Sequence, residues 1–316
     1  MSFVSFVVPA FVFPAFSQQY PTRPIKIIVP FGPGGFTDVA ARILQKELAP
    51  AIGQPIVIEN KPGAGSTIGT AEIANAPADG YTLVMISTTH VISPHLYKQM
   101  PYDPIKDFTP VMKLAEGPYV LVVHPSLGVN SVHELIALAK AKPNTIDYAS
   151  SGNGSSQHLV GALFAAMADA PLSHVPYKGS SQAMNDVLGG IVKVSFVGVP
   201  NALPSLQAGK IRALAVSTKK RYAELPNVPT LDEAGVKGYD ATIWLGLLAP
   251  PGTPRDIVQK LNTSITRILS TAEAKRLMAS AGVDVATSTP EEFGALMQSE
   301  LDRWGKVVRA TGATVN

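Results

Sequence analysis

Four loops in this sequence join a short apolar run to a segment of helical period through glycine and hydroxyl residues. They span residues 30–38 (PFGPGGFTD), 87–90 (STTH), 150–156 (SSGNGSS) and 177–181 (YKGSS). Ligands of open α/β sheets bind outside the carboxyl ends of the strands, where such loops lie. Glycine lets backbone approach a ligand, and free amides at a helix N-terminus favour an anion. Together with neutral hydroxyl donors, these loops predict a carboxylate held without a formal counter-charge.

Each loop also has a purely structural interpretation, because every α/β protein needs turns between strands and helices. Serine, threonine and glycine are common there as helix caps. Asp38 has two such roles open to it: pairing with Arg42 four residues later, or bracing the first loop. Four loops of one design, two in each half of the chain, favour a shared site.

An enzymatic alternative depends on Ser155 or Ser156 with His158, which stands three residues after Ser155. A nucleophile elbow would need glycine at position 158, and a dyad would need an orienting group and an oxyanion hole. We therefore favour a helix-face role for His158. The hydrolase remains the runner-up, and it predicts ester turnover that is lost when the serine is replaced.

Composition excludes several other classes. The 316 residues are 46% apolar and 16% charged, with a net charge of +3 and no basic cluster, so no nucleic-acid partner is expected. Cysteine is absent, which rules out disulfides and thiolate chemistry. The histidines show no metal-ligand spacing, and neither a metal nor a cofactor is expected.

The N-terminus predicts export. Residues 3–16 form an apolar run that is too short to span a bilayer, and Pro9 and Pro14 argue against a buried helix. The run resembles a signal peptide within residues 1–19, with cleavage near Ser17–Gln18, although no Lys or Arg precedes it. No later segment is long and apolar enough for a membrane helix, so we expect a soluble periplasmic protein.

Alternating strand and helix patterns predict an α/β fold with two blocks. Two Thr-Pro pairs, at 253–254 and 289–290, predict helix starts with threonine as the N-cap. Ser131 and Glu134 predict a capping box. The expected strands are 25–29, 56–59, 81–86, 119–124, 146–149, 173–175, 192–197, 211–217 and 242–248; helices are expected at 37–48, from 67, at 131–141, 155–168 and 180–188, and after each Thr-Pro pair.

Many short motifs in a fixed order resemble the periplasmic solute-binding proteins of tripartite tricarboxylate transporters, also called the Bug family. They include residues 20–25 (YPTRPI), 29–35 (VPFGPGG), 59–66 (ENKPGAGS), 78–83 (ADGYTL), 151–159 (SGNGSSQHL), 174–179 (HVPYKG), 186–190 (DVLGG), 225–230 (LPNVPT), 244–247 (WLGL) and 249–254 (APPGTP). The resemblance covers nearly all of the chain after residue 19.

The resemblance implies a two-domain type II periplasmic-binding-protein fold with a hinge and an inter-domain cleft. Domain 1 would comprise residues 22–120 and 241–316, and domain 2 residues 121–240. It further implies a protein that closes on a small carboxylate and then docks on a membrane permease. We also expect a monomer. The implied ligand residues are Gly35, Phe36, Thr37, Asp38, Ser87, Thr88, Thr89, Ser150, Ser151, Gly152, Asn153, Gly154, Ser155, Tyr177, Lys178 and Gly179.

The chain departs from the family pattern at two places. Relatives usually have Phe-Asp where this chain has Phe196-Val197, and losing that acid makes the cleft wall less negative, which disfavours an amino acid as ligand. Phe36 adds an apolar wall, which favours an aromatic or aliphatic carboxylate over citrate. A sensory adaptor that presents the ligand to a receptor needs the same clamp, so this third alternative stays open.

Overall fold

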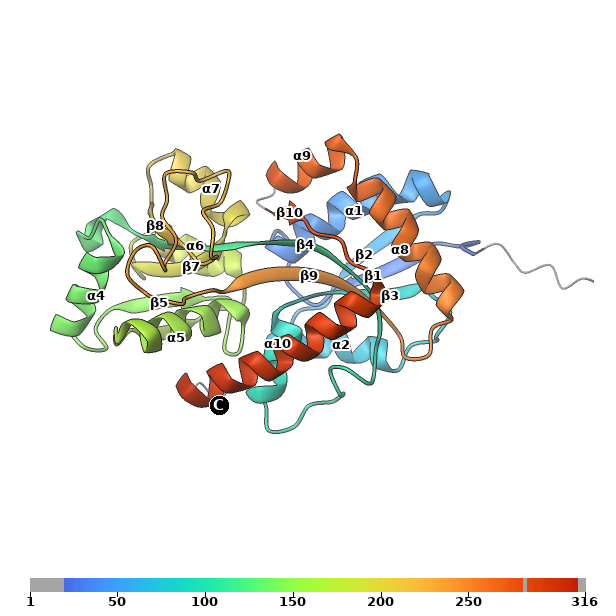
Figure 1. Cartoon of the computed structure of the whole chain (residues 1–316), viewed down its shortest axis with the longest axis horizontal. Helices are drawn as coiled ribbons and strands as arrows, with labels where there is room; N and C mark the ends of the chain where they lie inside the picture. Colours follow the sequence, from blue (N-terminus) through green and yellow to red (C-terminus); the bar gives the residue numbers. More distant parts are fainter. Residues whose placement is uncertain (1–19, 281–282, 312–316) are drawn as a thin grey trace, which may run out of the picture.

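A computed structural model describes residues 20–280 and 283–311, and the leader predicted at residues 1–19 lies outside them. The strands form a mixed sheet whose two halves lie side by side and are linked by the long strands β4 and β9 (Figure 1). The strand order is β2 (Ile56–Asn60), β1 (Ile25–Val29), β3 (Thr82–Ser87), β9 (Thr242–Ala249), β4 (Thr109–Val123), β7 (Val194–Gly198), β5 (Asp147–Ser150) and β6 (Ser173–Pro176), with β8 (Arg212–Val216) and β10 (Asp284–Val285) also paired to β4.

The first half of the sheet consists of β1, β2, β3, β9 and the start of β4. Strands β1, β2 and β3 are parallel, whereas β9 is antiparallel to β3 and β4. Four of the five residues of β1 are fully buried, as expected for a strand covered on both faces. The helices of this half are α1 (Phe36–Ile52), α2 (Thr67–Ala74), α3 (Thr89–Ile92), α8 (Arg255–Leu269), α9 (Ala272–Ser280) and α10 (Pro290–Thr311), with short 3₁₀ turns η1 (Ala64–Ser66) and η2 (Ser93–His95).

The second half of the sheet comprises the end of β4 with β5, β6, β7 and β8. Side chains alternate along β4, so Val120 and Val122 join one apolar cluster while Leu121 and Val123 join the other. The helices here are α4 (Val132–Ala141), α5 (Ser156–Ala168), α6 (Ser180–Leu188) and α7 (Val199–Gln207), with the 3₁₀ turn η3 (Pro125–Leu127).

The chain passes between the halves at two adjacent places. Within β4, residues 109–118 pair with β9, and residues 119–123 pair with β7 and β8. The return passage leads from Ser217, after β8, to Ala241, before β9. Ser217 joins both passages, because its Oγ accepts a bond from Tyr119 N (2.9 Å) and donates to the Ala241 carbonyl.

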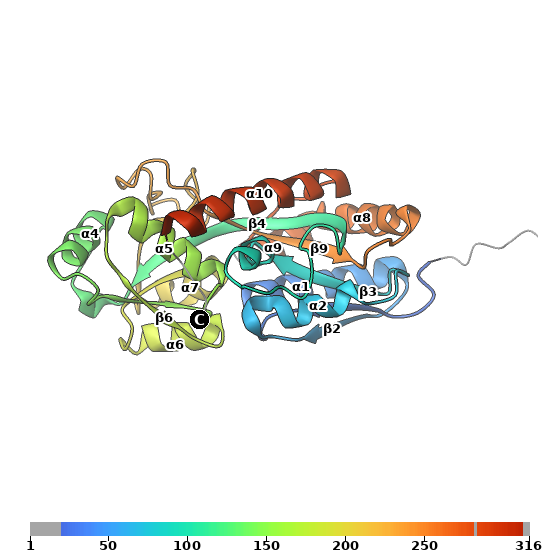
Figure 2. The same cartoon turned by 90° about the horizontal axis from the view of Figure 1, so that it is seen from below.

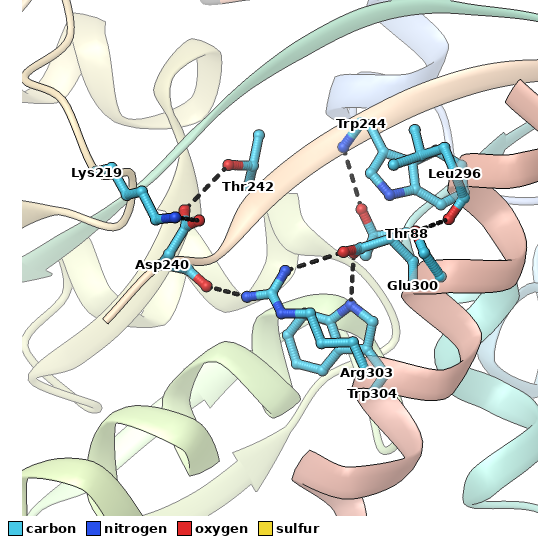
Figure 3. A network of polar contacts seen from close by, with 10 residues as sticks. Thr88, Lys219, Asp240, Thr242, Trp244, Leu296, Glu300, Arg303 and Trp304 are labelled. Atoms are coloured by element: carbon cyan, nitrogen blue, oxygen red, sulfur yellow. Dashed lines mark hydrogen bonds and ion pairs between the residues drawn. The ribbon is translucent and has the colours of Figure 1, made fainter. Parts of the chain in front are cut away.

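Helix α10 lies along β4 and crosses from the first half toward the second (Figures 1 and 2). Near its end, Arg303 donates to the carbonyl of Asp240 at the return passage, and Glu300 accepts from both Arg303 Nη1 and Trp304 Nε1, each at 3.0 Å (Figure 3). Trp304 is 1% exposed. The helix is thus bonded directly to a segment that connects the two halves.

Most of the expected elements are confirmed, with shifted ends. Strand β4 begins at Thr109 and not at Tyr119, and helices α7 and α9 were not predicted. The N-cap predicted at Thr289 is confirmed, since Glu292 N donates to Thr289 Oγ1 at 3.1 Å. The Thr253 N-cap is wrong: its hydroxyl donates to the Pro250 carbonyl (2.8 Å), and Pro254 is the cap position.

The capping box predicted at Ser131 forms in a shifted version. Ser131 Oγ accepts from Glu134 N at 3.1 Å, as expected, but the Glu134 carboxylate accepts from Asn130 N and not from Ser131 N. Among the described residues, no helix combines the length and apolarity that a bilayer crossing requires.

Candidate functional site

A cavity of about 650 Å³ lies between the two halves of the sheet, at the ends of strands from both. The two rims come close together, since a Cβ added at Gly34 would lie 3.9 Å from Ser181 Oγ. The lining includes most of the residues expected from sequence: Gly35, Phe36, Thr37, Ser87, Thr89, Ser151, Gly152, Asn153, Ser155, Tyr177, Lys178 and Gly179.

Several helices of the described chain begin at the cavity wall, among them α1, α5, α6 and α7. The N-cap residues of α1, α6 and α7 are Gly35, Gly179 and Gly198, and none of these helices has a side-chain cap. Helix α5 begins at Ser155, whose Oγ accepts from His158 N at 3.2 Å. The first amides of a helix have no partner within the helix. Three uncapped ends therefore direct N–H groups and the positive ends of helix dipoles toward one space.

Four expected residues do not line the cavity. Asp38 is 2% exposed and faces away from it, toward Gly34 N, Arg42 Nε and Asn60 Nδ2, each 2.9 Å from a carboxylate oxygen. Burial opposes the charge of Asp38, but hydrogen bonds from Arg42, Gly34 and Asn60 outweigh it and hold the pKa of that carboxyl below its usual range. Asp38 thus both pairs with Arg42 and braces the first loop.

The other three expected residues that do not line the cavity are Thr88, Ser150 and Gly154. Thr88 Oγ1 accepts from Trp244 N at 3.1 Å, and Ser150 Oγ lies 2.6 Å from His174 Nε2. Gly154 N donates to His158 Nδ1 at 3.2 Å. These residues hold the loops in place from behind, because their polar groups are used within the protein.

The loop 150–156 depends on backbone that only glycine adopts easily. Gly152 has φ of 130° and Gly154 has φ of 75°.

Beneath the loop, the rings of His158 and His174 stack with centroids 3.8 Å apart. Burial lowers the pKa of His158 to about 4, and burial followed by the charge of His158 lowers the pKa of His174 to about 3.

Sequence reasoning missed a substantial part of the wall. Apolar and small residues there come from Phe31, from the turn 62–66 and from β9. The turn belongs to a motif that carried the family resemblance, whereas Tyr119 stood inside an apolar run with no local signal. The lining residues outside the implied ligand set are Pro30, Phe31, Gly32, Pro33, Pro62, Gly63, Ala64, Gly65, Ser66, Tyr119, Ser156, Gln157, Ser180, Ser181, Gln182, Gly198, Asn201 and Ile243. Seven of them lie within the four predicted loops: Pro30, Phe31, Gly32, Pro33, Ser156, Ser180 and Ser181.

The electrostatics of the wall favour an anion. Of the lining residues in the described chain, Lys178 alone carries a charged side chain, and no carboxylate is among them. No group of three His, Asp or Glu residues in the described ranges is placed to hold a metal ion. The cavity therefore offers amides, hydroxyls and one cation.

Comparison with known proteins identifies the family. Residues 40–313 match the tripartite tricarboxylate transporter family receptor. Protein BugT of Bordetella pertussis is 38% identical over 302 residues, which cover 95% of this chain and 93% of that protein. The structure of Rpa4515 from R. palustris with adipate superposes with a TM-score of 0.90 at 38% identity, covering 94% of this chain and 100% of that one. The periplasmic binding protein BugD superposes with a TM-score of 0.88 at 34% identity, covering 93% and 99%.

The chain belongs to the tripartite tricarboxylate transporter receptor family. It is therefore a solute-binding receptor of a transporter, not an enzyme, and the expected periplasmic-binding-protein fold is confirmed. The geometry around Ser155 agrees with this. Its hydroxyl accepts from the backbone of His158, whose Nδ1 is occupied by Gly154 N and whose ring stacks on His174. In the described chain, Ser155 Oγ therefore makes no hydrogen bond with a ring nitrogen of His158.

The two departures of this receptor from its family differ in their effect on the cavity. Phe36 lines the wall and is 8% exposed, so the apolar wall expected there exists. Val197 does not line the wall: it is fully buried in an apolar cluster with Val120, and Gly198 takes its place at the cavity. The expected change in wall charge at position 197 is therefore wrong for this backbone, because the side chain points into the core.

Proposed function

We propose that this receptor is exported to the periplasm, binds a small di- or aromatic carboxylate between its two lobes, and delivers it to a membrane permease. The lobes are residues 22–120 with 241–316, and residues 121–240. Membership of the receptor family, the adipate bound by Rpa4515 and the anion-favouring cavity support this proposal.

The observation that carries the proposal is the convergence of uncapped helix starts on a wall without carboxylates. Helices α1, α6 and α7 have no side-chain cap, which leaves their first-turn N–H groups available to a ligand, except at Pro200 of α7, which has no N–H. A carboxylate offers only acceptors when ionised, which matches this set of donors. An amino acid would also bring an ammonium group, for which the wall holds no anionic partner.

Cavity shape narrows the ligand class. Phe31, Phe36 and Ile243 give parts of the wall an apolar surface, which suits the methylenes or ring of a di- or aromatic carboxylate better than the polar carbons of citrate. A volume of about 650 Å³ falls within the range of small-molecule sites.

Closure of the lobes would trap the ligand. The two passages near Pro118 and Ala241 are adjacent, so small backbone rotations there would open or close the cavity as a hinge. The carboxylate would shift an existing equilibrium toward the closed form. We further propose that residues 1–19 are the leader that directs export, and that the protein acts in the periplasm as a monomer.

The experiment uses the full chain expressed with its leader and recovered from the periplasm. Mass spectrometry would identify any copurified small molecule, and a thermal-shift panel would compare adipate, malate, benzoate, citrate and glutamate. Adipate, malate or benzoate should raise the Tm most. Preferential stabilisation by glutamate would overturn the proposed ligand class.

A blocking variant provides the control. Gly179 lines the cavity in extended backbone, with φ of 168° and no atom within 4 Å of an added Cβ, so Gly179→Leu should fill the site without strain. Gly189→Leu, at the exposed other end of α6, is the matched control. The first should abolish the ligand-induced shift and the second should retain it, with both variants folded.

A further inference from the structure

Three hydroxyl groups meet on the buried part of the cavity wall and bridge the two halves of the sheet. Thr89 comes from the first half, Ser156 opens α5 in the second, and Tyr119 lies on β4 where the chain passes between them. All three residues line the cavity, yet they are only 1%, 6% and 2% exposed. A group bound there would therefore be almost completely removed from water.

The hydrogen bonds of this cluster have a definite direction. Tyr119 OH donates to Ser156 Oγ at 2.5 Å, and Thr89 Oγ1 donates to the same oxygen at 3.3 Å. Thr89 Oγ1 in turn accepts from Ser156 N at 3.3 Å. Burial raises the pKa of Tyr119, and its bond to Ser156 opposes this only in part, so the phenol stays a donor.

A serine hydroxyl has one proton and two lone pairs. Both lone pairs of Ser156 are occupied by Tyr119 and Thr89, whereas its own proton goes to no acceptor within residues 20–280 and 283–311. We infer that Ser156 is a ligand-binding residue whose hydroxyl is held as a donor toward the cavity, and that Tyr119 is the positioning residue that holds it so.

Tyr119 is well fixed for this task. Its N–H donates to Ser217 Oγ and its carbonyl accepts from Ser217 N, each at 2.9 Å, so the backbone is held at the passage between the halves. The phenol therefore reaches Ser156 from a rigid base. The Ser156 hydroxyl can therefore donate to a carboxylate oxygen. It disfavours a group that presents only N–H donors, because Ser156 has no lone pair left to accept from them.

This inference rests on the proposed function and assigns the chemical group at the buried end of the site: a carboxylate, neither an ammonium nor an amide nitrogen. Ser156 lies in the predicted loop 150–156, but that motif does not indicate a donor role for its hydroxyl, and Tyr119 lies outside the four loops. Tyr119 acts through Ser156, so its effect on binding should disappear when the serine hydroxyl is removed.

The test is a double-mutant cycle with Ser156→Ala, Tyr119→Phe and the double variant, measured by calorimetric titration with adipate and with malate. Ser156→Ala should weaken binding about 10- to 100-fold, as expected for a hydrogen bond to a charged group. Tyr119→Phe should weaken it about 10-fold, and the double variant should bind within about 2-fold of Ser156→Ala. Tyr222→Phe is the matched control, since Tyr222 OH is buried without a partner among the described residues.

Thermal unfolding of each variant separates a loss of binding from a loss of fold, and Ser156→Ala alone tests the donor if Tyr119→Phe does not fold. Two results would overturn the inference while leaving the proposed function intact. One is wild-type affinity in Ser156→Ala. The other is a loss of affinity in the double variant that equals the product of the losses in the two single variants. If the wild-type protein bound neither adipate nor malate, nor any other carboxylate of the panel, the proposed function would fail and the inference with it.

Discussion

Acidification from pH 7 to pH 5 should destabilise this receptor through histidines that are buried in the neutral form. His158 is 7% exposed, stacks on His174 at an interplanar angle of 10°, and accepts a bond from Gly154 N at Nδ1. Protonation of Nδ1 would remove that acceptor and place a charge beside a second imidazole. His90 is fully buried, and its Nε2 donates to the Pro104 carbonyl while Nδ1 has no partner among the described residues.

The sign and size follow from proton linkage. Burial lowers the pKa of His158 and of His90 from 6.5 to about 4. A pKa depressed in the folded state means that the unfolded chain binds more protons, so the stability contributed by neutral histidine is complete above pH 6.5 and declines toward pH 4. Between pH 7 and pH 5 each of the two should cost about 2 kcal/mol. His174 is more exposed, and solvent screening makes its share smaller.

The assay is urea unfolding followed by the fluorescence of the buried Trp244 and Trp304, at pH values from 5 to 7. His158→Asn removes the titrating ring and offers an amide oxygen in place of Nδ1. It should be less stable than wild type at pH 7 but lose about 2 kcal/mol less on acidification. His133→Asn, on the exposed side of α4, should keep the wild-type pH dependence. An unchanged pH dependence in His158→Asn would refute the reasoning.

Three further variants test the fold and the hinge. Gly246→Ala should destabilise by about 1–3 kcal/mol in urea unfolding, because its Cβ would lie 2.0 Å from Phe293 Cζ; adding Phe293→Leu should recover part of the loss. Asp38→Ala should cost about 1–3 kcal/mol by leaving Gly34 N without its acceptor, and it should weaken adipate binding in calorimetry. Arg303→Met removes the bond from α10 to the Asp240 carbonyl and should increase the radius of gyration of the ligand-free protein in small-angle scattering, with little change in Tm; an unchanged radius would speak against α10 as a hinge restraint.

Local patterns in this chain were reliable where neighbouring residues decide the structure. The run IKIIV became the buried strand β1, Ser155 became the cap of α5, and the strand–loop–helix junctions lie at the cavity as expected. These features depend on side-chain alternation, capping hydrogen bonds and glycine conformation, which act over a few residues. The same signals could not show β4 as a strand of fifteen residues, because its pairing with β9 joins segments far apart in sequence.

The sequence by itself therefore determined the α/β class, the family and the loops that surround the site. Only the tertiary structure decided which side chains face the cavity: Asp38 and Thr88 turn away to brace the loops, whereas Tyr119 and Ser156 turn toward it. The physical reason is that a side chain's direction depends on partners from distant segments, such as Asn60 for Asp38 and Ser217 for Tyr119. Periodicity and capping carry no information about those partners.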